Sequence, residues 1–300
     1  HRSLHAEPTP RGGGLSIVIL VLSSTFILWL LELLPAPDLL AIGVGGLLVA
    51  VTGWLDDHYD VPALWRAIAY LGASVWAVYW VMVSDLSANL MLYVLSGIAV
   101  IAIAWLTNLY NFMDGSDGLA AGQAIFTGMV VAVLLSMSDQ TGLSILLLVL
   151  AGASSGFLIW NRPPAKIFMG DAGSCLVGFM FAVTAMITAT QGSISLAVWL
   201  ILLAVFICDA SLTLLKRILN RERWYQAHRS HAYQLTVQYG FSHKQLLAAF
   251  LLLNIILLIP SALMAYFWSG WQWWVASGIY ILMSGLWIYI QLNCSQENAN

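Results

Sequence analysis

Ten long apolar runs divide this sequence, and they constrain its fold more than any other feature. Each run is about 17 to 25 residues long, the length that an α-helix needs to cross roughly 30 Å of hydrocarbon. The composition agrees, because 61% of the residues are hydrophobic and 8% are charged, against about half and a quarter in soluble domains. We therefore predict an all-α, polytopic transmembrane helical bundle that forms one integral-membrane domain over residues 1–300, with spans near 15–34, 37–55, 63–83, 89–109, 118–137, 142–160, 173–190, 194–215, 245–267 and 271–291.

The positions of Lys and Arg orient this bundle. All 11 basic residues fall in the N-terminal segment or in the loops after the second, sixth and eighth spans, which lie on one side of a ten-span bundle. Cytoplasmic loops carry the excess of Lys and Arg, so we expect that side to face the cytoplasm. All six histidines lie there too. The three cysteines lack C-x-x-C spacing, which indicates neither a disulfide framework nor a zinc site, and no basic patch predicts nucleic-acid binding.

Carboxylate and amide side chains gather where the spans end on this side. GWLDDHYD ends the second span with two adjacent acids, and NLYNFMDGSDG ends the fourth with four polar residues at three-residue intervals. Residues so spaced drift slowly round one helix face and can line one wall of a cleft. The alternatives are a helix end that returns to solvent and a polar interfacial turn. The candidate residues are Asp56, Asp57, Asn108, Asn111, Asp114 and Asp117.

The loop after the sixth span reads WNRPPAKIFMGDAGS. Two prolines break the helix, and Asp171 stands where the next helix begins. The amides of a first helical turn bind phosphate readily, and Arg162 and Lys166 lie in the same loop. The alternative is a capped turn with basic residues of the kind that face the cytoplasm.

Histidine and arginine recur in the longest loop, which contains RERWYQAHRSHAYQ, and in the N-terminal HRSLHAEPTPRGGG. His228, Arg229 and His231 add donors suited to a diphosphate, as do His5 and Arg11. The longer loop is also compatible with an amphipathic segment on anionic headgroups. Several loops thus combine carboxylates with cationic groups on one membrane face, and oxygen ligands favour Mg²⁺ or Mn²⁺ over zinc. The pattern predicts a metal-diphosphate site at the cytoplasmic interface.

Four motifs in fixed order, GWLDDHYD, NLYNFMDGSDGLAAG, KIFMGDAGS and HRSHAYQ, resemble those of the polyprenyl-phosphate N-acetylhexosamine-1-phosphate transferases, and the resemblance covers nearly the whole chain. It implies eleven transmembrane helices, so we expect one more helix upstream of His1. It also implies transfer of a sugar 1-phosphate from a UDP-N-acetylhexosamine to undecaprenyl phosphate, with release of UMP, at the cytoplasmic face of a bacterial inner membrane. A homodimer is compatible with the same resemblance.

The resemblance also implies roles for single residues. Asp171 would be the principal ligand of Mg²⁺, with Mn²⁺ as the alternative ion, and Asp114 a second carboxylate of the same cluster. Asp56 and Asp57 would position or deprotonate the lipid phosphate. The expected substrate contacts are Asn111 and Asp117 on the nucleotide, Phe168 stacked on uracil, and His5, Arg11, His228, Arg229 and His231 on the phosphates or the sugar. Asn108 and Lys166 are further expected substrate-binding residues.

Departures from the family pattern indicate a branch. The peptidoglycan enzymes have a Lys-containing TPTMGG segment where this chain has PTPRGGG, which argues against a MurNAc-pentapeptide substrate. Enzymes that transfer GlcNAc-1-phosphate often carry an HxHH cluster, whereas Tyr233 and Gln234 stand here at its last two positions. The combination looks most like the branch that starts lipopolysaccharide O-antigen units, with GlcNAc or a 6-deoxy-HexNAc such as FucNAc or QuiNAc.

Two other functions fit the sequence less well. Asp114, Asp117, Gly118 and Ala121 match the start of the CDP-alcohol phosphotransferase motif D-x-x-D-G-x-x-A-R, but Gly122 replaces the arginine and no downstream G-x₃-D-x₃-D follows. A membrane transporter would carry ionisable groups within its spans, and the candidate for that is Asp209. It lies seven residues before Lys216, about 10 Å along a helix, and so can reach the cytoplasmic site instead.

Overall fold

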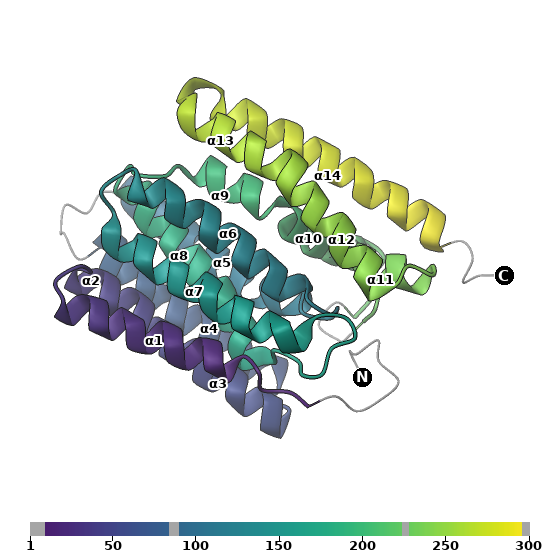
Figure 1. The fold of residues 1–300 in the computed structure, drawn as a ribbon, viewed down its shortest axis with the longest axis horizontal. Helices are drawn as coiled ribbons and strands as arrows, with labels where there is room; N and C mark the ends of the chain where they lie inside the picture. The colour runs from purple at the N-terminus through teal and green to yellow at the C-terminus, as the bar shows by residue number, and fades with distance from the viewer. Residues whose placement is uncertain (1–9, 84–89, 224–227, 296–300) are drawn as a thin grey trace.

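The computed structural model describes residues 10–83, 90–223 and 228–295, and every regular element in those ranges is a helix (Figure 1). The α-helices are α1 (Leu15–Leu30), α2 (Ala36–Leu39), α3 (Gly45–Tyr59), α4 (Ala63–Val78), α5 (Leu90–Phe112), α6 (Leu119–Ser136), α7 (Thr141–Asn161), α8 (Asp171–Thr190), α9 (Leu196–Leu202), α10 (Ala204–Leu219), α11 (Ala232–Gln238), α12 (His243–Leu253), α13 (Ile259–Phe267) and α14 (Gln272–Ser295). Short π-helical segments η1 (Leu40–Val44), η2 (Tyr79–Val83) and η3 (Asn254–Leu258) continue α2, α4 and α12, and the 3₁₀ turn η4 (Ser269–Trp271) precedes α14.

Apolar helices of membrane-spanning length confirm the predicted multi-pass helical architecture. In the described ranges seven segments are long and apolar enough to cross a membrane, and a bent pair would make eight. The helices predicted over 15–34 and 63–83 are present, but α1 and α4 have only 16 residues each. The count of ten spans therefore stays a prediction. The seven segments are Ala36–Tyr59, Leu90–Phe112, Leu119–Ser136, Thr141–Asn161, Asp171–Thr190, His243–Phe267 and Ser269–Asn293.

Helix α8 is the centre of the bundle. Its apolar window is 94% buried inside the protein, and it packs against α3 and α5. Small residues permit these close approaches: a Cβ atom at Gly53 of α3 would lie 2.5 Å from the Asp171 carbonyl group, and one at Gly178 would lie 2.6 Å from the Leu106 carbonyl oxygen. The first residue of α8 is therefore held firmly between two neighbouring helices.

The segment predicted as one span over 194–215 is broken. It forms α9 and α10, which meet at Leu203 with a bend of 77°. The hairpin of α12, α13 and α14 runs along the side of the bundle next to this bend, opposite α1 (Figure 1). Helix α10 after the bend packs against α14, α5 and the short helix α11.

The loops predicted to be cytoplasmic lie together at one end of the bundle. The segment Pro10–Gly14 pairs with the loop before α8: Phe168 N donates to Pro10 O at 2.9 Å, and Gly13 N donates to Phe168 O at 3.0 Å. Asn161 links two further loops, because Gly118 N donates to its Oδ1 and its Nδ2 donates to Ile167 O, both at 2.9 Å. Sequence positions far apart are thereby joined around the start of α8.

Candidate active site

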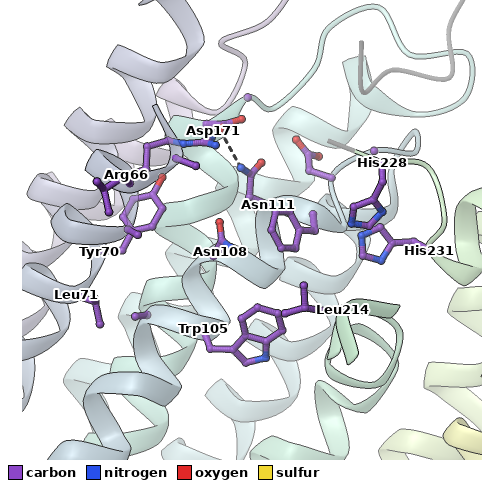
Figure 2. Close-up of a pocket in the computed structure, with 18 of the residues that line it drawn as sticks. Arg66, Tyr70, Leu71, Trp105, Asn108, Asn111, Asp171, Leu214, His228 and His231 are labelled. Carbon is purple, nitrogen blue, oxygen red and sulfur yellow. Dashed lines mark hydrogen bonds and ion pairs between the residues drawn. The ribbon is translucent and has the colours of Figure 1, made fainter. Parts of the chain in front are cut away.

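A cavity of about 810 Å³ opens between α4, α5, α10 and the loops of this end. Figure 2 shows Arg66 and Asp171 on one of its sides and His228 and His231 on the other, with Leu71, Trp105 and Leu214 further from the loops. Polar and apolar residues thus occupy different parts of one space. The predicted site residues that line it are Arg11, Asn108, Asn111, Asp114, Phe168, Asp171, His228 and His231.

Asp171 is the first residue of α8 and the hub of the polar part. Its Oδ2 accepts hydrogen bonds from Asn111 Nδ2 at 2.9 Å and from Arg66 Nη1 at 3.2 Å. The amide of Asn111 is oriented by Ser174, whose hydroxyl donates to Asn111 Oδ1 at 3.1 Å. Arg66 also forms an ion pair with Asp56. Groups from α4 and α5 therefore meet at the Asp171 carboxylate of α8, and Arg66 links it to Asp56 of α3.

The carboxylate of Asp57 occupies the N-terminus of α8, where the sequence predicted that phosphate would bind. The backbone N–H of Asp171 donates to Asp57 Oδ1 at 3.1 Å, and that of Ala172 donates to Oδ2 at 3.2 Å. Gly170 makes this approach possible, because it has a φ of 79° and because a Cβ atom there would lie 2.7 Å from Asp57 Oδ2. These two amides of α8 are consequently capped by a carboxylate, and phosphate would have to displace Asp57 to use them.

Asp114 lies in the turn between α5 and α6, close to the same carboxylates. Burial raises the pKa of Asp114 well above its usual 3.8, and the negative charges of Asp171 and Asp57 raise it further. A hydrogen bond from the Gly170 backbone and the charge of Arg11 act in the opposite direction. A cation placed among these carboxylates would relieve the cost of ionising Asp114.

The donor set suits a hard divalent cation. Within the described part of the chain, no three His, Cys, Asp or Glu side chains are grouped as a ready-made metal cage. Mg²⁺ does not require one, since it commonly binds one or two carboxylates together with substrate phosphates and water. The half-buried Asp114 and the neighbouring Asp171 both line the cavity and fit that pattern. Their oxygen ligands also accommodate Mn²⁺.

The histidines face the cavity from the segment that precedes α11. The rings of His228 and His231 lie 4.8 Å apart between centroids, and His231 lies 6.0 Å from Phe112. His231 is buried, and its Nδ1 has no hydrogen-bond partner in the described structure. Gln234, which the sequence pattern placed at a former histidine position, also lines the cavity.

The remaining predicted site residues lie elsewhere. Asp117 is 1% exposed and accepts a hydrogen bond from Ala165 N at 2.9 Å, so its carboxylate holds the loop before α8 rather than lining the cavity. Lys166 lies over the Trp160 ring, 5.8 Å from its centroid, and Arg229 is exposed outside the cavity lining. Their substrate contacts stay predictions. His5, and the aromatic residues 224 and 225 of the amphipathic alternative, lie outside the described residues.

Arg66 and Tyr70 line the cavity although sequence analysis assigned them no role there. In the sequence, Arg66 indicates only the membrane orientation. A charged residue close to the start of an apolar span, ten positions after two adjacent aspartates, is a signal for function and would have found it. Tyr70 follows one helical turn later on α4.

The comparisons with known proteins agree with this site. The sequence pattern described as glycosyl transferase family 4 matches residues 39–189, which contain α3 to α8 and most of the carboxylates described above. The chain belongs to this family. The family assignment confirms the resemblance to polyprenyl-phosphate N-acetylhexosamine-1-phosphate transferases.

Individual relatives of this family member cover most of the chain. A probable undecaprenyl-phosphate N-acetylglucosaminyl 1-phosphate transferase of Bacillus subtilis is 28% identical over 87% of this chain and 75% of its own length. A decaprenyl-phosphate N-acetylglucosaminephosphotransferase of Mycolicibacterium smegmatis is 31% identical over 81% and 69%. A phospho-N-acetylmuramoyl-pentapeptide-transferase of Desulforamulus reducens is 41% identical, but over only 28% of this chain and 25% of its own. The protein is therefore a multi-pass membrane phosphoglycosyltransferase of the family to which these polyprenyl-phosphate enzymes belong.

Proposed function

We propose that this protein transfers an N-acetylhexosamine 1-phosphate from a UDP-sugar to undecaprenyl phosphate, releasing UMP at the cytoplasmic face of a bacterial inner membrane. The observation that carries the proposal is the two-part character of the cavity. Its polar part holds Asp114, Asp171 and two arginines, and its apolar part is lined by Leu64, Leu71 and Ile101 among others. Leu64 is 69% exposed and Ile101 66% exposed on the outer surface of the bundle. A lipid-linked phosphate can therefore enter from the bilayer with its chain in lipid and its headgroup at the carboxylates.

The reaction joins two anionic substrates, so positioning and charge neutralisation carry most of the catalysis. An oxygen of the lipid phosphate attacks the sugar-bearing phosphorus of the donor. The bond from that phosphorus to the oxygen bridging the two phosphates then breaks, and UMP leaves with that oxygen and the bonding electrons. Arg66 and Arg11 lie where they can balance the negative charge of both substrates, with His228 and His231 on the opposite wall.

A strong general base is not required. A phosphate monoester has a second pKa of about 6, so the lipid phosphate is largely dianionic at neutral pH. Asp56 already pairs with Arg66, and Asp57 already caps α8. These contacts favour a positioning role for the two aspartates over proton abstraction, and they favour direct transfer over a phosphorylated aspartate.

Asp171 and Asp114 would hold Mg²⁺, or Mn²⁺ in its place. The ion would supply positive charge to the donor diphosphate. Asn111 and Ser174 keep the Asp171 carboxylate oriented toward the cavity.

For the sugar we propose GlcNAc or a 6-deoxy-HexNAc such as FucNAc or QuiNAc, as the first residue of an O-antigen or another cell-surface polysaccharide. The support comes from two sources. The relatives that cover most of the chain are named for N-acetylglucosamine, and Tyr233 and Gln234 replace two histidines of the HxHH pattern.

The deciding experiment is UMP release by purified protein in detergent with undecaprenyl phosphate and Mg²⁺. UDP-GlcNAc, UDP-GalNAc, UDP-FucNAc and UDP-QuiNAc are offered separately, with lipid-free and EDTA controls. We expect release that requires lipid and metal and that is fastest with one of the three proposed sugars. Lack of release with every donor, from protein shown to be folded, would refute the proposed reaction, and preference for UDP-GalNAc would refute the sugar assignment.

A further inference from the structure

Asp209 is a buried carboxylate that the proposed chemistry does not use. It lies on α10, after the bend at Leu203, and its side chain is 7% exposed. It is not one of the residues that line the cavity. A carboxylate at such a place is costly unless its oxygens are well hydrogen-bonded. Its partners should therefore indicate why it is there.

Both carboxylate oxygens bind the beginning of α11. Ala232 N donates to Oδ1 at 2.7 Å, and Tyr233 N donates to Oδ2 at 3.1 Å. Thr213 Oγ1 adds a third hydrogen bond, to Oδ1 at 3.2 Å. Asp209 thus caps a helix that belongs to a different part of the chain, in the same way that Asp57 caps α8.

The residue just before this helix is His231. Its Nδ1 lies 3.6 Å from Asp209 Oδ1, which is too long for a hydrogen bond but close enough for an ion pair with a protonated imidazole. His231 in turn lies against His228, and both rings face the cavity. The capped amides and the cavity-facing imidazole are therefore adjacent along the chain.

A second anchor holds the other side of the same loop. Gln291 of α14 donates from Nε2 to Ser230 O at 3.0 Å, and Lys216 Nζ donates to Gln291 Oε1 at 2.8 Å. The Ser230 hydroxyl contacts His228 Nδ1 at 2.9 Å. Two buried side chains from the membrane helices therefore determine where the histidine segment, residues 228–231, can lie.

We infer that Asp209 is a positioning residue for donor binding, which acts through His231 by capping α11. The inference rests on the proposed function, in which His228 and His231 bind the phosphates or the sugar of the donor. A loop without this anchor would have to be ordered at each binding event, and that ordering opposes binding. Loss of the anchor should therefore weaken donor binding and leave the rate of the chemical step nearly unchanged.

The variant Asp209→Asn keeps the size of the side chain but leaves one of the two amides facing an NH₂ group. Because a lost hydrogen bond to a charged group is worth about tenfold or more in affinity, we expect the KM for the UDP-sugar to rise about tenfold with a smaller change in kcat. Thr213→Val is the control: it removes the third hydrogen bond, and the one that Trp287 Nε1 donates to the same hydroxyl at 3.1 Å, but leaves both amide contacts; its donor KM should not change. A fall in kcat with an unchanged donor KM in Asp209→Asn would overturn the inference.

Combination with His231→Ala tests whether the effect passes through the histidine. If it does, the double variant has the donor KM of His231→Ala alone, to within about twofold. Multiplication of the two single effects would contradict the inference. Asp209→Glu, whose extra methylene shifts the carboxylate from the amides, is the second variant and must show the same dependence on His231, so the test holds even when the Asn variant fails to fold.

Limited proteolysis tests the anchor without the reaction. Arg229 and Arg223 are both exposed trypsin sites, and only Arg229 lies in the histidine segment. We expect cleavage after Arg229, relative to cleavage after Arg223, to accelerate about tenfold in Asp209→Asn, because the segment opens locally more often, and not in Thr213→Val. An unchanged ratio would refute the anchor, whereas inactivity of the wild-type enzyme toward every donor would refute only the proposed function.

Discussion

Arg66 and Asp171 meet at 3.2 Å, although 105 residues separate them in the sequence. The same guanidinium pairs with Asp56, so one cation on α4 links the end of α3 to the start of α8. The side chains of Arg66 and Asp171 are only 14% and 12% exposed, which limits the screening of this contact by water. Arg66 is therefore the counter-charge of two carboxylates on which the proposed reaction depends.

Replacement of Arg66 by Gln should lower kcat/KM about 100-fold. It leaves two poorly hydrated carboxylates without their partner, and the loss of one member of a buried pair costs about 3–5 kcal/mol. We expect Tm to fall as well. Arg66→Lys is the control: it retains the charge but not the planar guanidinium whose Nη1 contacts both carboxylates, so it should recover part of the activity. Near-wild-type kcat/KM in the Gln variant would show that the cation is dispensable.

Asp171→Asn should abolish UMP release while the protein stays folded. The amide keeps the size of the side chain and removes the negative charge that a divalent cation needs. Two measurements check this, UMP release and Mn²⁺ binding followed by electron paramagnetic resonance, with size-exclusion chromatography as the folding control. Substantial residual activity, or Mn²⁺ affinity equal to that of the wild type, would contradict the metal assignment.

The two adjacent aspartates should differ in their effect on stability. Asp57 caps two amides of α8, and loss of a helix cap costs about 0.5–2 kcal/mol. We therefore expect Asp57→Ala to lower Tm and Asp57→Asn, which retains one acceptor oxygen, to lower it less. Differential scanning fluorimetry of the purified variants measures both. Equal Tm values for Asp57→Ala and the wild type would mean that the cap does not stabilise the fold.

The pKa of Asp114 predicts a pH-dependent stability. Because this pKa is raised above its usual 3.8, the folded protein holds the proton more tightly than the unfolded chain does. The stabilisation is complete below 3.8 and is lost as the pH rises through the raised pKa. Each pH unit between the two values changes the free energy of unfolding by about 1.4 kcal/mol, or about 3–6 °C in Tm for a protein of ordinary domain size.

The measurement is Tm against pH in EDTA for the wild type and for Asp114→Asn, which cannot ionise. We expect the difference between the two curves to grow with pH in favour of the Asn variant. Added Mg²⁺ should reduce that difference, because a cation stabilises the ionised carboxylate. Parallel curves over the whole range would contradict the raised pKa.

Gly115 should not tolerate a side chain. A Cβ atom at this position would collide with the hydroxyl oxygen of Tyr233, which donates to Phe112 O at 3.0 Å. Gly115→Ala should therefore separate the α5–α6 turn from α11, with a cost of about 1–3 kcal/mol and loss of most activity. Gly152→Ala on α7 is the matched control: its Cβ atom meets nothing within 4 Å, so Tm and activity should stay at wild-type values or above.

Much of the architecture could be predicted from apolar runs and basic loops. A membrane helix must satisfy its own backbone hydrogen bonds, so each run of sufficient length is read locally as a helix, and the predicted helices are present in the described ranges. The bend between α9 and α10 could not be read in the same way. Residues around Leu203 continue an apolar run without a proline or glycine, so no local signal marks the break; in the structure, α9 packs against α13 and α14.

The candidate site, too, was predictable only in part. Residue type and position in the loops were sufficient to nominate Asp114, Asp171 and the histidines, because ionisable groups on one membrane face are rare enough to be informative. Their partners were not predictable. Asp57 caps α8, Arg66 joins two carboxylates, and Asp117 is buried against Ala165. These contacts depend on distances in space, which a single sequence does not contain.

By itself, therefore, the sequence determined that the chain lies in a lipid bilayer, that it is helical, and to which family it belongs. It also determined which chemical groups are available for the reaction. Hydrophobicity and motif order are properties of the linear chain, so these conclusions need no tertiary structure. The tertiary structure decided which carboxylate caps a helix, which pairs with arginine and which lines the cavity. Those choices follow from the close packing of α3, α4, α5 and α8, where hydrogen bonds of about 3 Å leave each oxygen room for few partners.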